Sequence, residues 1–330
     1  TLTNNITINS YISINKSLTI NFGGYTITSK NTVDLNTIDF NKTEASEDGT
    51  GKINGHGFDI GETTGEGVTV IFKNGKLITD KWGGWVENKA TFNVEKGFSI
   101  YSSTLDEKLD NANAVTVEKG ATLNLYGKAE TRYGPTISGN GTQNYGDVVI
   151  NIYDDAEVTS GNDVAIYMPN TKELNIKGGT ITGTTAVYVK YGTTNISGGT
   201  LIATGDKKDY AINGNGGDAT GAALVIDVCC NYPGGDPIVV IGDKCTFQVK
   251  TGDNVESADL ISYYHNKDDA THEATITNNS TYQVVEYEYD ATTAKATKVT
   301  TSESGNEENT TQGGTTEGED QGGNQSEANA

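Results

Sequence analysis

The sequence predicts an all-β fold, a parallel β-helix solenoid, on three observations. A short strand with a central asparagine recurs along the chain, and glycine pairs follow two of its copies. The copies are spaced by 20 to 31 residues. No window shows the apolar stripe of an amphipathic helix. A repeat of this length that holds strands and no helix is typical of a β-solenoid.

The repeat is clearest where residues 175–180 return almost unchanged as residues 195–200. Alternation within each strand sends apolar side chains into the bore and asparagines outward, where their amides can stack in a column. We expect the glycine pairs 178–179 and 198–199 to turn corners, because glycine accepts a positive φ. The full series of strands is Phe92-Asn93-Val94, Leu123-Asn124-Leu125, Ile150-Asn151-Ile152, Leu174-Asn175-Ile176 and Thr194-Asn195-Ile196.

Other strands complete the predicted coils. A second strand precedes three of the copies, at 114–117, 165–167 and 186–189. Near the start of the chain, residues 18–27 read as strand, turn and strand, and residues 68–72 as another strand. With roughly 24 residues per coil, the solenoid is expected to contain about ten coils.

A family resemblance supports this prediction. The run SLTINFGGYTIT, residues 17–28, resembles the opening coil of right-handed parallel β-helix proteins of the pectin-lyase-like superfamily. The turns IKGGT and ISGGT resemble those of repetitive members on phage particles and bacterial surfaces, notably fibres and adhesins. The resemblance covers residues 1–250 and implies a right-handed solenoid. It does not select a function, because the superfamily includes lyases, hydrolases, tailspikes and scaffolds.

The pattern changes beyond residue 250. Residues 282–289 alternate and are followed by a second short strand at 294–300, so residues 251–300 are predicted to form a small β cap or hairpin. Residues 301–330 contain no aromatic or large aliphatic side chain, and they are predicted to be a disordered, acidic, low-complexity tail. Because the sequence starts at Thr1 rather than at Met, we expect a processed chain or a fragment.

Charge narrows the classes of partner. The formal net charge is −21, and Arg132 is the only arginine. Nucleic acids and anionic membranes are therefore not expected as partners, since both are recognised through basic patches. No apolar stretch approaches the ~18 residues of a membrane span, so membrane insertion is not expected either.

The catalytic motifs of the superfamily are incomplete in this chain. The segment around His56 is similar to the Gly-His-Gly of polygalacturonases, but the paired aspartates Asp154 and Asp155 lie far downstream and no Arg-Ile-Lys follows. Arg132 lacks the neighbouring aspartates that a calcium-dependent lyase uses. The sequence therefore predicts no catalytic residues. The alternative is a polysaccharide lyase or glycoside hydrolase that uses carboxylates such as Asp106 or Asp154.

No metal or cofactor is predicted. Cys229, Cys230 and Cys245 lack zinc-binding spacing, and a disulfide from Cys245 to one of the other two stays open. Residues 213–218 resemble one turn of a calcium-binding nonapeptide repeat, a motif that needs consecutive copies. His265 and His272 show no partner in the sequence.

The expected function is that of a non-enzymatic structural or attachment protein exposed on a virion or a bacterial cell surface. It would be a phage head or tail fibre, a decoration protein or an adhesin. The expected partners are a host-cell surface glycan or other virion or surface subunits, and a homotrimer is the candidate assembly. Tyr126, Tyr133 and Tyr153 are considered with the tryptophans as one aromatic groove. The candidate glycan contacts are Trp82, Trp85, Asn124, Asn151 and Asn175.

Overall fold

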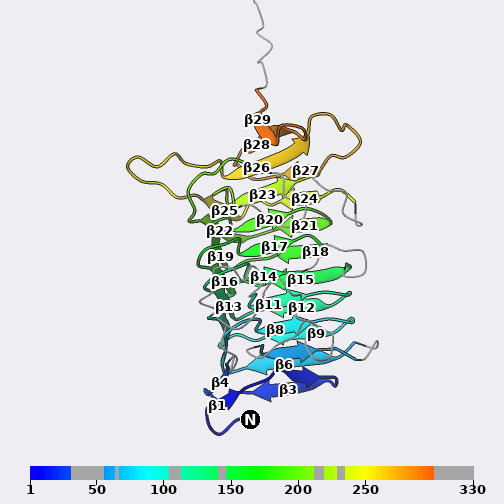
Figure 1. Cartoon of the computed structure of the whole chain (residues 1–330), viewed down its shortest axis with the longest axis vertical. Coiled ribbons are helices and arrows are strands. Elements are labelled where there is room, and N and C mark those ends of the chain that lie inside the picture. Colours follow the sequence, from blue (N-terminus) through cyan, green and yellow to red (C-terminus); the bar gives the residue numbers. More distant parts are fainter. Residues whose placement is uncertain are drawn as a thin grey trace, which may run out of the picture. The chain divides into compact units, whose positions relative to one another are not determined.

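The regular structure of this chain consists of β-strands. The computed structural model describes residues 1–30, 56–63, 67–103, 113–139, 146–211, 219–228 and 235–300. The regular elements assigned in these ranges are all β-strands. Residues 1–299 form one compact unit (Figure 1). No helix in the described ranges has the length and hydropathy needed to cross a membrane. The predicted tail, residues 301–330, lies outside the described residues.

The strands belong to three long sheets, named A, B and C. Sheet A contains, in spatial order, β1 (Ile6–Ile8), β4 (Thr26–Ser29), β7 (Gly75–Thr79), β10 (Phe98–Ser102), β13 (Lys128–Thr131), β16 (Glu157–Ser160), β19 (Thr180–Gly183), β22 (Gly199–Ala203) and β25 (Cys245–Gln248). Sheet B contains β2 (Ile12–Ile14), β5 (Phe58–Ile60), β8 (Gly84–Val86), β11 (Val115–Val117), β14 (Ile137–Ser138), β17 (Ile166–Met168), β20 (Val187–Val189), β23 (Leu224–Asp227), β26 (Ile261–Asn266), β28 (Val284–Asp290) and β29 (Lys295–Lys298). Sheet C contains β3 (Leu18–Asn21), β6 (Thr69–Lys73), β9 (Thr91–Val94), β12 (Thr122–Leu125), β15 (Val148–Ile152), β18 (Thr171–Ile176), β21 (Thr193–Ile196), β24 (Ile238–Ile241) and β27 (Thr275–Asn278).

Successive strands go to the three sheets in turn, so each group of three forms one coil, and coils stack through the sheets (Figure 1). All strand pairings in the described residues are parallel except that of β28 with β29. This arrangement is consistent with a parallel β-helix solenoid. The prediction of an all-β fold of stacked parallel strands is confirmed.

Apolar side chains of all three sheets fill the bore. In sheet C, Leu123, Ile150 and Leu174 are in register on neighbouring coils, and each is fully buried. Leu125, Ile152, Ile176 and Ile196 repeat this arrangement two residues further along the strands, and they too are buried. Because side chains alternate across a strand, the residue between these two apolar positions points outward. The predicted inward and outward positions of this sheet are confirmed.

Glycine is required at the corner between sheets C and A. Gly179 and Gly199 have φ values of +80° and +93°, in the region that side chains disfavour. A Cβ at Gly199 would also lie 2.7 Å from the carbonyl oxygen of Gly178 on the preceding coil. These corners therefore need glycine for its φ and for the close approach of two backbones.

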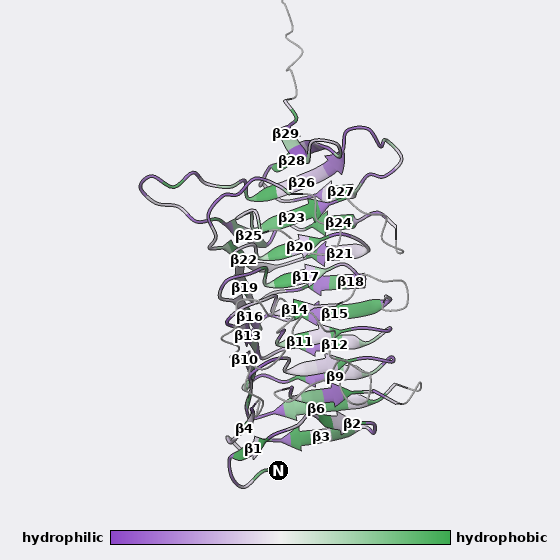
Figure 2. Ribbon diagram, viewed as in Figure 1, coloured by the Kyte–Doolittle hydropathy of each residue, from purple (hydrophilic) through white to green (hydrophobic). Residues whose placement is uncertain are grey.

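The middle strands of sheet B differ from those of sheet C because both of their faces are buried. All residues of β17, β20 and β23 are buried, whereas β12 and β21 alternate between buried and half-buried residues. Figure 2 shows the same contrast, with hydrophobic colouring along β17, β20 and β23 and hydrophilic segments in β18 and β21. Some of the buried outward side chains of this sheet are charged, notably Asp59 and Asp227, with exposed fractions of 1% and 0%.

Parallel pairing continues beyond residue 250, where the sequence repeat fades. β26 extends sheet B and β27 extends sheet C, both in parallel register with the preceding coil. After β27 the chain returns to sheet B as β28, which pairs parallel with β26, and then folds back as the antiparallel strand β29. Sheet B thus continues in parallel register from β23, before residue 250, to β26, after it. The hairpin of residues 284–298 ends this sheet.

Candidate functional site

The outer face of sheet C carries a column of five asparagines, called here the asparagine ladder. Each side-chain amide after the first donates a hydrogen bond to the asparagine of the preceding coil, at donor–acceptor distances of 2.8, 2.9, 3.1 and 3.0 Å along the column. The ladder side chains are half-buried. From the N-terminal end of the column, the ladder consists of Asn93, Asn124, Asn151, Asn175 and Asn195.

The ladder keeps hydrogen-bonding capacity for a ligand. A side-chain amide has two N–H donors and two acceptor positions, and a ladder member uses one of each with its neighbours. Asn175 also lies 3.5 Å from Glu173 Oε2 through its amide nitrogen, so its second donor faces a carboxylate. Ile71 and Val240 occupy the same register position on the coils just outside the ladder, and they end it. The result is a short, regular row of paired donors and acceptors.

A stack of two tyrosines and a lysine borders the ladder. Tyr126, Tyr153 and Lys177 each lie two residues after a ladder asparagine, and so on the same outer face. The two rings are nearly parallel, with centroids 4.0 Å apart and an interplanar angle of 12°. Lys177 Nζ lies 4.5 Å from the Tyr153 ring centroid. The hydrogen bond with Tyr153, aided by burial, raises the pKa of Tyr126 to about 12, so its hydroxyl is neutral at ordinary pH.

Lys177 is a member of this surface that the sequence analysis missed. The signal was present, because the position two residues after each asparagine is occupied in turn by Glu95, Tyr126, Tyr153, Lys177 and Ser197. Reading these positions as one column requires the register of the coils. The varying loop lengths between the repeats hide that register.

The tryptophans lie on a different sheet. Trp85 belongs to β8 of sheet B, and its ring meets that of Trp82 edge-on at a centroid distance of 4.5 Å. His56 lies against Trp82 at 4.3 Å and is 5% exposed. The expectation of a single groove formed by the tryptophans with Tyr126, Tyr133 and Tyr153 is wrong. Tyr126 and Tyr153 follow strands of sheet C, at the corner remote from sheet B, and Tyr133 follows β13 of sheet A.

The carboxylates considered for catalysis are exposed or lie outside the described residues. Asp154 and Asp155 are exposed, and Asp155 forms a 2.8 Å ion pair with Lys96, which lies two coils nearer the N-terminus. Asp106 falls outside the described residues. Arg132 is exposed and lies 5.7 Å from the Tyr133 ring centroid. Within the described ranges, no group of three or more His, Cys, Asp or Glu side chains is placed to hold a metal ion.

Two histidines have partners that the sequence did not reveal. His265 Nε2 lies 2.9 Å from Glu286 Oε1, and His272 Nδ1 lies 3.0 Å from Asp236 Oδ1. These partners were not visible in the sequence because the carboxylates come from other strands or loops. Both pairs lie near the C-terminal end of the solenoid.

Cys245 packs as a small apolar residue. Its thiol is buried and donates to the carbonyl oxygen of Ile196 at 3.1 Å. Burial also raises the pKa of this thiol, so it is protonated and unreactive at neutral pH. Cys229, Cys230 and residues 213–218 lie outside the described residues.

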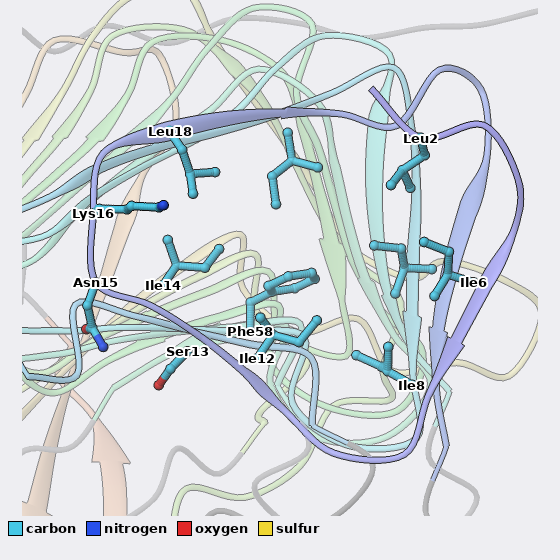
Figure 3. A pocket seen from close by; sticks show the side chains of 12 residues that line it. Leu2, Ile6, Ile8, Ile12, Ser13, Ile14, Asn15, Lys16, Leu18 and Phe58 are labelled. Carbon is cyan, nitrogen blue, oxygen red and sulfur yellow. The ribbon is translucent and has the colours of Figure 1, made fainter.

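A cavity of about 500 Å³ opens at the first coil. Figure 3 shows Leu2, Ile8, Ile14 and Leu18 pointing into it from the surrounding chain. β1, β2 and β3 are the terminal strands of their sheets, and Ile6 and Ile12 remain 39% and 38% exposed. The cavity is thus the open end of the bore. Among the described residues that line it, Lys16 alone is ionisable, so these residues provide no acid–base pair.

The fold and this face together define a class: a parallel β-solenoid that presents a row of paired amides on one sheet. The chain matches no protein-family model, and it matches no curated protein and no solved structure. The assignment of a function therefore rests on the geometry of the solenoid and of its outer faces.

Proposed function

We propose that this chain is a non-enzymatic structural or attachment protein whose asparagine ladder contacts a neutral glycan. The observation that carries this proposal is the ladder itself, five amides held in register at the strand spacing of a sheet. Amide groups pair well with hydroxyls, because each can both donate and accept. A row of amides at constant spacing suits a polymer that repeats its hydroxyls at regular intervals.

Charge favours a neutral glycan over an acidic one. The chain has a net charge of −21 and one arginine, so a polyanion would be repelled by most of its surface. The neighbouring stack adds two tyrosine hydroxyls and one lysine. These groups extend the polar row without creating a basic patch.

The superfamily and the handedness of the coils are part of the same proposal. We infer a right-handed solenoid of the pectin-lyase-like type. Parallel strands joined by crossover connections are right-handed in nearly all known sheets, which supports this handedness. The SLTINFGGYTIT run and the glycine corners support the superfamily.

A solenoid of this kind serves as a stiff spacer on a surface exposed to the environment. We place the chain on a virion, as a head or tail fibre or decoration protein, or on a bacterial cell as an adhesin. Its partners would be a host-cell surface glycan and other virion or surface subunits, with a homotrimer as the candidate assembly. The alternative of a lyase or glycoside hydrolase finds less support, because His56 is buried against Trp82.

The test is binding of the full chain to an array of neutral and acidic glycans. Asn151→Ala and Tyr153→Ala alter the ladder face, Trp85→Ala alters sheet B, and Thr182→Ala on sheet A is the control. We expect binding to neutral glycans that weakens about tenfold in the first two variants, as the loss of one or two hydrogen bonds would give. The other two variants should bind as the parent does.

Two results would overturn the proposal. The first is that no neutral glycan binds the parent chain. The second is that Thr182→Ala or Trp85→Ala weakens binding as much as the ladder variants do. Circular dichroism of each variant checks that the strands are retained.

A further inference from the structure

A lysine and an aspartate are buried together on the outer face of sheet B. Lys190 directly follows β20, and Asp227 is the last residue of β23 on the next coil. Val189 and Ile226 are register partners, so the residues that follow them lie opposite each other. Lys190 Nζ is 3.4 Å from Asp227 Oδ2, and both side chains are 0% exposed.

Aromatic side chains surround the pair and shield it from solvent. The hydroxyls of Tyr188 and Tyr210 donate to Asp227 Oδ2 and Oδ1, each at 2.8 Å. Lys190 Nζ lies 5.6 Å from the Tyr188 ring centroid. Both tyrosines belong to a buried cluster with Val164, Tyr167, Ala222, Val225, Tyr264 and Tyr289. Burial of two charges in such a cluster is costly, because water no longer solvates either group.

We propose that Lys190 and Asp227 join in an intramolecular amide bond. The pair brings the required nucleophile and acyl group into contact. The two residues lie at the ends of neighbouring parallel strands of one sheet. Neither side chain is accessible to solvent. The proposal is independent of the glycan surface, which lies on sheet C.

The chemistry balances without a cofactor or an oxidant. A proton moves from the Lys190 ammonium to the Asp227 carboxylate, which leaves an amine beside a carboxylic acid. The Nζ lone pair attacks Cγ and forms the N–C bond, and one further proton of Nζ passes to the acid hydroxyl. The C–O bond then breaks and one water molecule leaves. Tyr188 and Tyr210 donate to the two carboxyl oxygens and can stabilise the oxygen charge that develops during attack.

The bond would staple two neighbouring coils. It joins the coil of β20 to the coil of β23 across the connection between residues 190 and 227. Closing that length of chain limits the unfolded state, as a disulfide of the same span would. The amide would also replace a buried ion pair by a neutral group.

The test is intact-mass spectrometry of the purified full chain after denaturation. We expect a mass lower than that of the sequence by one water molecule. Proteolysis should then yield a branched peptide that contains both Lys190 and Asp227. Lys190→Arg should have the full mass of its sequence, since a guanidinium is not acylated by the carboxyl group. Lys119→Arg, which alters the ion pair with Glu87, should keep the deficit.

A parent chain with the full sequence mass overturns the proposal, and this holds whether or not the variants fold. A water deficit that persists in Lys190→Arg also overturns it, because the water was then lost elsewhere. Tyr188→Phe keeps the ring and removes one donor to the carboxyl group, so the bonded fraction measured soon after synthesis should fall. An unchanged bonded fraction in Tyr188→Phe would contradict the role given to that hydroxyl.

Discussion

At the residue scale, Tyr264 links stability to pH. Burial raises its pKa to about 12, and its ring stacks on Tyr210 and Tyr287. An unfolded tyrosine titrates near pH 10, so the folded state binds this proton more tightly. The contribution of Tyr264 is therefore complete below pH about 10 and is lost as the pH rises through about 12.

We expect the free energy of unfolding of the parent chain to fall between pH about 9 and about 11.5, measured by denaturant titration. In Tyr264→Phe the fall should be smaller by about 2 kcal/mol, because this titration is removed. Comparing the pH dependence rather than the absolute stability cancels the hydrogen bonds that the substitution deletes at every pH. An equal fall in the two proteins would show that Tyr264 titrates normally.

Gly199 and Gly97 separate two reasons for a glycine. Both have a positive φ, at +93° and +83°, but a Cβ at Gly97 would meet nothing within 4 Å. Gly97→Ala should therefore cost about 1 kcal/mol, the strain of the backbone alone. Gly199→Ala should cost more than about 2 kcal/mol, because its Cβ would also press on the backbone of the preceding coil. Denaturant unfolding of both variants measures this difference, and equal costs would contradict the close approach.

At the element scale, a substitution at the centre of the asparagine ladder should lower the stability of the chain more than one at its end. Asn151 both donates to Asn124 and accepts from Asn175, whereas Asn195 takes part in one bond of the ladder. With about 1 kcal/mol per hydrogen bond, Asn151→Ala should destabilise the chain roughly twice as much as Asn195→Ala. Thermal unfolding of the two variants tests the ratio. A ratio near one would contradict the prediction, because the number of ladder bonds at an asparagine would then not set its contribution to stability.

The sequence predicted this element well because its information is local. Alternation within one strand is enough to assign Leu123 to the bore and Asn124 to the outer face. The same asparagine in five successive strands then predicts a column. The predicted stacking of the amides is present in sheet C.

Contacts between coils were not predictable in the same way. Lys190 and Asp227 lie 37 positions apart, and no motif marks either of them. Their contact depends on the register of β20 with β23, which the connection between these strands does not disclose. The partners of His265 and His272 were missed for this reason. The single groove predicted from the two tryptophans and three tyrosines was wrong because Trp85 belongs to sheet B, whereas Tyr126 follows a strand of sheet C.

At the scale of the whole molecule, the solenoid separates its roles by face. Sheet B is buried on both faces at β20 and β23 and contains the tyrosine cluster with the lysine–aspartate pair. Sheet C exposes the asparagine ladder and the tyrosine stack. If the proposed function holds, the buried pair and the polar face of the solenoid thus serve stability and binding separately.

The central claim is that this rod binds a neutral glycan and leaves it uncut. Size-exclusion chromatography with light scattering tests both parts at once, applied to the full chain mixed with each of a panel of neutral polysaccharides. We expect the protein to co-elute with at least one polysaccharide, and the polysaccharide to keep its original chain length after prolonged incubation. A polysaccharide that becomes shorter, or a protein that elutes alone from every mixture, would contradict the claim that the chain binds a neutral glycan without cutting it.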